Sequence, residues 1–171
     1  MAIRPLLSLK ARAIGLLAQR EHSRAELRRK LLRIEQRQRL AAVGAAEAGE
    51  ADSPVPDDDS ASGETAVDAL LDALATDGYL DETRFVESRL HLRSGRFGAQ
   101  RIQQELAQHG LKLGAEQQAS LRATELERAR EVWHKRFGAE PARDASEQAR
   151  QTRFLLARGF AADIVRRLLK A

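Results

Sequence analysis

Arginines at helical spacing are the residues of this sequence whose type and position point to chemistry. Arg24 and Arg28 lie four residues apart, as do Arg89 and Arg93, so the members of each pair share one helix face. A guanidinium group is planar and permanently charged, and it matches phosphate and carboxylate oxygens. The pattern predicts binding to a polyanion or an acidic protein surface. The candidate contact residues are Arg24, Arg28, Arg29, Arg89, Arg93, Arg96, Arg101, Arg150, Arg153, Arg158, Arg166 and Arg167.

Residues for catalysis or metal binding do not come together in the sequence. The four histidines, His22, His91, His109 and His134, fall at separate helix ends and faces, and there is no cysteine to supply a thiolate. The sequence also lacks a glycine-rich phosphate loop and the serine turn of hydrolases. We therefore expect a binding protein that is not an enzyme and carries neither a metal nor a cofactor.

The positive charge is concentrated outside one acidic segment. Residues 41–66 contain seven Asp and Glu and no Lys or Arg. The rest of the chain therefore carries 29 Lys and Arg against 18 Asp and Glu, a net charge of +11. Arginine–glutamate pairs on solvated helices account for part of this charge but not for the excess. Such a body favours a polyanionic partner.

Short amphipathic helices are predicted for most of the chain. Leu, Ala, Arg, Glu and Gln dominate the composition and favour helix, and β-branched residues are too scattered for a sheet. Ser23 begins a capping box, and Thr65 and Asp81 are further expected helix starts. Glycines are the expected helix ends, at Gly78, Gly110, Gly138 and Gly159.

An internal sequence repeat indicates that these helices form repeated units. Two eleven-residue stretches share an arginine, a leucine and a glycine at the same positions, and an apolar residue follows each glycine. The matching positions are Arg101 and Arg150, Leu106 and Leu155, and Gly110 and Gly159. The sequence therefore predicts an all-α fold of three tandem three-helix repeats.

The repeats are expected at residues 9–78, 81–123 and 125–171. Each is too small to hold a core alone, so we expect neighbours to stack into an elongated, curved array. The first repeat is interrupted at about 41–65, where Ala, Gly, Asp, Ser and Pro dominate. This acidic insert has too little apolar surface to offset the entropy of ordering, so it is predicted to be disordered. Whether it is a spacer or a regulatory element is left open.

The sequence gives no sign of export or of a membrane anchor. No apolar run approaches the ~20 residues that span a bilayer. The first residues reach Lys10 and Arg12 too soon for a secretion signal. Together with the lack of cysteine, this predicts a soluble protein of the cytoplasm.

Four stretches of the sequence resemble the RecX family, bacterial regulators of the RecA recombinase. HSRAELRRKL at 22–31 resembles its first-repeat signature, and DGYLDETRF at 77–85 resembles the join to its second repeat. GRFGAQRIQQELAQHG at 95–110 resembles the second repeat, and RFLLARGFAADI at 153–164 the third. The four occur in the family's order and are spread along most of the chain, from 22 to 164, on both sides of the acidic insert.

The resemblance implies three tandem three-helix repeats that lie in the groove of the RecA–single-stranded-DNA filament. It also implies suppression of filament growth, ATP hydrolysis, strand exchange and coprotease activity. We expect a monomer that also binds single- and double-stranded DNA weakly and without sequence preference. The long acidic segment departs from shorter members of the family, which have a brief link there.

Two other functions fit the same composition. Three-helix units resemble helix-turn-helix domains, so the chain is alternatively a stand-alone DNA-binding protein, although no unit shows a polar recognition helix. A structural adaptor with solvated charges is the third interpretation. Aromatic residues able to stack on bases are few, and Tyr79, Phe97 and Trp133 are each predicted to be packing residues.

Overall fold

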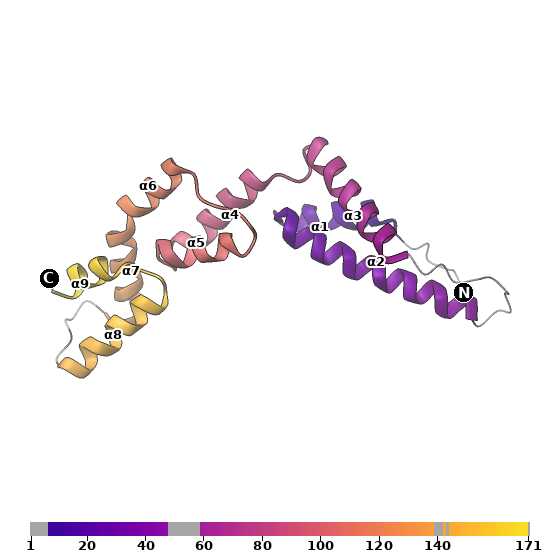
Figure 1. Cartoon of the computed structure of the whole chain (residues 1–171). Helices are drawn as coiled ribbons and strands as arrows, with labels where there is room; N and C mark the ends of the chain where they lie inside the picture. Colours follow the sequence, from indigo (N-terminus) through magenta and orange to yellow (C-terminus); the bar gives the residue numbers. More distant parts are fainter. Residues whose placement is uncertain (1–6, 48–58, 139–141, 143, 171) are drawn as a thin grey trace. The chain divides into compact units, whose positions relative to one another are not determined.

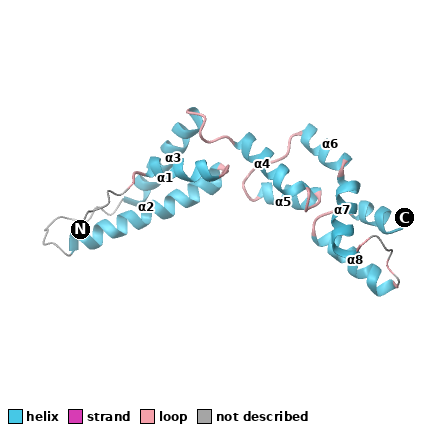
Figure 2. Cartoon of the chain, turned by 180° about the vertical axis from the view of Figure 1, so that it is seen from behind, coloured by secondary structure: helices cyan, strands magenta, loops and turns pink. Residues whose placement is uncertain are grey.

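The computed structural model describes residues 7–47, 59–138, 142 and 144–170. Within these ranges all regular structure is helical (Figures 1 and 2). The helices are α1 (Leu9–Gln19), α2 (Arg24–Glu47), α3 (Asp59–Thr76), α4 (Glu82–Ser94), α5 (Ala99–Ala107), α6 (Ala115–Ala123), α7 (Glu125–Phe137), α8 (Ala145–Ala157) and α9 (Ala162–Lys170). The all-α prediction is confirmed. None of these described helices has the length and hydropathy that crossing a bilayer requires.

The chain folds into two compact units, which divide within α4 between Phe85 and Val86. This division does not coincide with the predicted limits of the three repeats, 9–78, 81–123 and 125–171, which stay a prediction.

The first unit buries leucines from α1, α2 and α3 against one another. Its core residues are Ala13, Leu27, Leu31, Val67, Leu71, Leu74 and Leu80. Ser23 begins α2 as predicted, because its Oγ accepts a hydrogen bond from the backbone N–H of Glu26 at 3.1 Å. Asp81 likewise begins α4, accepting from the N–H groups of Thr83 and Arg84 at 2.8 and 3.2 Å.

The predicted insert at 41–65 is too long. α2 continues to Glu47 and α3 starts at Asp59, so residues 41–47 and 59–65 are helical, and Thr65 is not a helix start. The physical reason is that 41–47 are mostly Ala and Glu, which extend a helix already begun. The interval 48–58 lies outside the described residues.

The second unit has its main core between α7, α8 and α9. The buried residues are Ala129, Val132, Trp133, Leu155, Phe160, Ile164, Val165 and Leu168. The indole N–H of Trp133 donates to Oε1 of Gln151 at 2.9 Å, and both side chains are buried. Each therefore gives the other the hydrogen-bond partner that burial would otherwise remove.

The internal sequence repeat corresponds to one backbone turn that occurs twice in this unit. Gly110 and Gly159 both have positive φ, 75° and 79°, which glycine adopts without steric cost. After them, Leu111 N–H donates to Leu106 O at 3.0 Å, and Phe160 N–H to Leu155 O at 3.3 Å. Leu106 and Leu155 are fully buried. The shared residues thus end α5 and α8 in the same way.

Candidate nucleic-acid interface

The end of α4 and the loop that leads to α5 carry two of the predicted contact arginines, Arg93 and Arg96, and a phenylalanine. The N–H groups of Arg96 and Phe97 both donate to Arg93 O, each at 3.0 Å, so the chain turns tightly at the end of α4. Phe97 is half-buried. The turn therefore holds Arg93, Arg96 and the Phe97 ring close together.

A backbone crossing brings α8 to this loop. Gly98 N–H donates to Arg158 O at 2.9 Å, and Gln100 N–H donates to Gly159 O at 3.2 Å. A Cβ atom on Gly98 would lie 2.2 Å from Gly159 O, so only glycine permits the approach. The crossing sets Arg158, at the end of α8, beside Phe97.

Three guanidinium groups surround the Phe97 ring. Their Cζ atoms lie 5.4 Å (Arg93), 5.9 Å (Arg96) and 5.8 Å (Arg158) from the ring centroid. We call Phe97 and these three arginines the Phe97 cluster. The ring's negative faces attract the cations and hold them in place. The cluster concentrates positive charge from helices that are distant in sequence.

Few carboxylates neutralise this charge. Arg93 pairs with Glu105 at 3.2 Å, but Glu105 is shared with Arg89 at 3.3 Å. Arg96 and Arg158 pair with no carboxylate among the described residues. A phosphate group would supply the missing negative charge and accept bidentate hydrogen bonds.

Further arginine–aromatic contacts extend from the cluster along α8. Arg158 also lies over Phe154, with 4.5 Å from Cζ to the ring centroid. Phe154 meets Phe137 edge to face at 5.1 Å, and Arg150 lies over Phe137 at 5.5 Å. Alternating cations and aromatic rings are features of surfaces that bind single-stranded nucleic acid.

Two predicted arginines of the first unit are already neutralised. Arg28 makes a bidentate pair with Asp68, at 2.7 and 2.9 Å, and contacts Glu64 at 3.0 Å. Arg24 pairs with Asp72 at 2.7 Å. The guanidinium of Arg28 lowers the pKa of the Asp68 carboxyl by hydrogen bonding to it. These arginines therefore join α2 to α3, and a partner must compete for them.

The other predicted arginines are exposed and do not join the Phe97 cluster. None of them has a carboxylate in ion-pair range among the residues described. They are Arg29 on α2, Arg101 on α5, Arg153 on α8, and Arg166 and Arg167 on α9. They contribute local positive charge on their own helices.

The predicted packing role of the aromatics holds for one of three. Trp133 is buried, as predicted. Tyr79 is 48% exposed, so its prediction is wrong: it follows Gly78, whose positive φ turns the chain outward at the end of α3. Phe97 is only partly buried, and its ring contacts cations.

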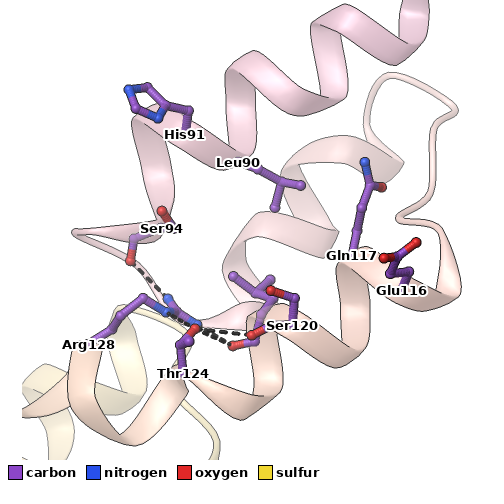
Figure 3. Close-up of a pocket in the computed structure, with 9 residues that line it drawn as sticks. Leu90, His91, Ser94, Glu116, Gln117, Ser120, Thr124 and Arg128 are labelled. Atoms are coloured by element: carbon purple, nitrogen blue, oxygen red, sulfur yellow. Dashed lines mark hydrogen bonds between the residues drawn. The ribbon is translucent and has the colours of Figure 1, made fainter.

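Arg128 of α7 is a residue that sequence reasoning missed. Its guanidinium donates to the carbonyl oxygens of Ser94, Phe97 and Leu121 at 2.8, 2.9 and 2.6 Å. Figure 3 shows Arg128 beside Ser94. These carbonyls lie at the ends of α4 and α6 and in the loop after α4, where intrahelical partners are lacking. Burial lowers the pKa of Arg128, yet an arginine stays charged at neutral pH. Arg128 therefore fixes the loop that presents Phe97.

Glu125, the first residue of α7, is the second missed residue. It is only 3% exposed, and its Oε1 accepts from the N–H groups of Ala99 and Ala161 at 3.1 and 3.3 Å. These groups lie at the starts of α5 and α9, where a negative charge is favourable. Glu82, the first residue of α4, does the same for α2, accepting from Arg24 N–H at 3.2 Å.

No group of three or more possible metal ligands occurs within the described part of the chain. A cavity of about 430 Å³ between α4 and α6 has Arg128 in its wall (Figure 3). The guanidinium of Arg128 is occupied by the carbonyls that it binds.

Comparison with known proteins identifies the family. Residues 123–169 match the family described as "RecX, third three-helix domain". The regulatory protein RecX of Leptothrix cholodnii is 46% identical, over 98% of this chain and 90% of its own length. That of Ralstonia pickettii is 44% identical, over 95% of this chain and 87% of its own length. The chain belongs to the RecX family. The resemblance to the RecX family is thus confirmed.

Two of these RecX stretches build the Phe97 cluster. The stretch 95–110 supplies Arg96 and Phe97, and the stretch 153–164 supplies Arg158. Each of these two stretches therefore contributes an arginine to the Phe97 cluster.

Proposed function

We propose that this chain is a non-catalytic regulator of RecA that binds in the groove of the RecA–single-stranded-DNA filament. It suppresses filament growth, ATP hydrolysis, strand exchange and coprotease activity, and it acts as a monomer in the cytoplasm without a cofactor. Its RecX relatives are named regulatory proteins, which supports this role. The observation that carries the proposal is the Phe97 cluster, whose Arg96 and Arg158 lack carboxylate partners among the described residues.

The physical basis is contact at several points along a polymer. Each helical repeat can touch a different part of the filament, and weak contacts on one chain add as avidity. Phosphates of the bound strand and acidic groove surface both attract arginine. Binding to bare DNA through the same residues is then weak, sequence-nonspecific and sensitive to salt.

The primary test is ATP hydrolysis by RecA on single-stranded DNA. We expect inhibition at ratios well below one chain per RecA protomer, because one bound chain affects several protomers. Inhibition that appears only when the chain saturates the free DNA would mean simple competition for the strand, against the proposal.

A charge-matched pair of variants tests the Phe97 cluster. R96A/R158A removes two charges without carboxylate partners, whereas R20A/R130A removes two that pair with Glu26 and Glu127. We expect only R96A/R158A to weaken inhibition and to reduce the log–log salt slope of single-strand binding, by about 0.7 for each phosphate that the variant no longer neutralises. Equal effects would show that only net charge matters. A strong preference of the wild type for one duplex sequence would instead favour a helix-turn-helix DNA-binding protein.

A further inference from the structure

A groove between α8 and α9 combines an apolar floor with a basic edge. Its volume is about 280 Å³, and Leu156, Val165 and Leu169 supply the apolar lining. Arg166 and Lys170, both exposed, stand at one edge. Leu156 is 43% exposed, so its side chain is accessible from the groove.

A second groove lies between α5 and α6, and its lining mixes apolar residues with Gln103, Lys112 and Gln118. Because α5 and α8 end in the same glycine turn, Ala107 corresponds to Leu156. The α5–α6 groove measures about 300 Å³ and includes Ala107, Lys112 and Gln118 in its lining. A helix with this ending therefore does not require a leucine at that position, and the exposed Leu156 is available to a partner.

The edge charges indicate what the α8–α9 groove binds. It has no acidic lining residue, and neither Arg166 nor Lys170 pairs with a carboxylate among the described residues. The opposite edge carries the neutral Gln148 and Thr152. An aliphatic side chain would fill the floor, and carboxylates on either side of it would meet the two cations. A nucleic-acid strand offers the charge without the aliphatic side chain.

We propose that the α8–α9 groove docks an acidic segment of a partner protein through one or two leucine-like side chains. It binds protein, whereas the Phe97 cluster binds phosphate. Only the identity of the partner rests on the proposed function: if that function is correct, the partner is a RecA protomer of the filament.

The first test uses the full chain, labelled with ¹⁵N, and a short synthetic peptide as the probe. The peptide carries two leucines flanked by Asp and Glu, and a control peptide replaces the acids by Lys. We expect the acidic peptide to shift amide signals of α8 and α9, with Leu156 and Arg166 among the most affected. Shifts confined to other helices, or equal binding of the Lys peptide, would overturn the proposal.

Variants of both grooves provide matched controls. L156Q removes the exposed apolar side chain, and A107Q places the same glutamine at the corresponding position of α5. R166E/K170E reverses the edge charge, and K112E reverses the exposed lysine of the α5–α6 groove. We expect L156Q and R166E/K170E to weaken peptide binding at least tenfold, with A107Q and K112E unchanged. Thermal unfolding by circular dichroism confirms that each variant is folded.

A RecA assay separates this proposal from the proposed function. We expect L156Q to inhibit RecA ATP hydrolysis at least tenfold less well than A107Q while binding an oligo(dT) strand equally well. If the wild type does not inhibit RecA, the proposed function fails and the peptide experiment still tests the groove. If L156Q inhibits as well as A107Q, the groove is not the RecA contact. Wild-type self-association that L156Q abolishes would show that a second copy occupies the groove, which also overturns the proposal.

Discussion

Replacing Glu125 by alanine should destabilise the second unit severely. The change removes both hydrogen bonds that Oε1 accepts, from the N–H groups of Ala99 and Ala161, and leaves the donors without that partner. A hydrogen bond to a charged group contributes about 1.5–3 kcal/mol, so losing two costs about 3–6 kcal/mol. E125Q keeps an acceptor oxygen but loses the charge that favours two helix starts, which costs about 1–2 kcal/mol in total.

Urea unfolding followed by tryptophan fluorescence measures these losses. Trp133 is the only tryptophan and lies in the core of the same unit, so its emission reports the relevant transition. Glu127, two residues along α7 and exposed, is the control site, and E127A should change the free energy of unfolding by less than about 0.5 kcal/mol. If E125A costs no more than E127A, the assignment of Glu125 as a shared cap of α5 and α9 is incorrect.

Three other substitutions have defined outcomes. G98A should destabilise the second unit by about 1–3 kcal/mol in urea, since its Cβ would meet the Gly159 carbonyl. G95A is the control and should cost far less, because the space around Gly95 is open. Equal losses of stability in the two variants would contradict the close crossing at Gly98. Q151L leaves the buried indole N–H of Trp133 without its partner, so thermal unfolding should show a loss of about 1–3 kcal/mol, and an unchanged stability would contradict that. Burial lowers the pKa of His22 below its usual 6.5, so stability should be retained above pH 6.5 and should fall below it, where the unfolded chain takes up a proton and the folded chain does not. Titration of stability against pH should show a smaller fall for H22N, and identical profiles would contradict this explanation.

Burial is the main cause of the lowered pKa of His22, and the charge of Lys30 acts in the same direction. Lys30 Nζ lies 2.9 Å from Nε2, and the carbonyl oxygen of Arg20 lies 2.9 Å from Nδ1. An ammonium group can only donate, so Nε2 accepts from Lys30 and the ring proton sits on Nδ1, which donates to Arg20 O. Protonating Nε2 would place two donors against each other.

Local features of the fold were readable from the sequence because they depend on neighbouring residues. The caps at Ser23 and Asp81 and the glycine turns at Gly110 and Gly159 involve groups within six residues of one another. Local chemistry fixes such features before any tertiary contact forms. The predicted insert is too long because composition alone does not show how far a helix already begun continues.

Only part of the candidate site could be predicted from the sequence. The sequence shows that arginines are abundant, but not which of them find acidic partners. Glu64 falls within the predicted disordered insert, yet it lies on α3 beside Arg28, 36 residues away in sequence. Arg128 and Glu125 bind groups 26 to 36 residues distant, and no local pattern reveals contacts of that range.

The caps supplied by Glu82 and Glu125 also set an order of events during protein synthesis. α2 has its Ser23 cap at once, but the N–H of Arg24 gains its acceptor only from a carboxylate made 58 residues later, and the N–H of Ala99 in α5 from one made 26 residues later. At about 5–20 residues per second, the first interval lasts about 3–12 s on the ribosome. α8 does not wait, because Asp144 accepts from the N–H of Glu147 at 2.8 Å as soon as that turn exists. The nascent chain therefore completes its helix starts in a staggered sequence, and the last hydrogen bonds of α2 and α5 form only after later segments have been made.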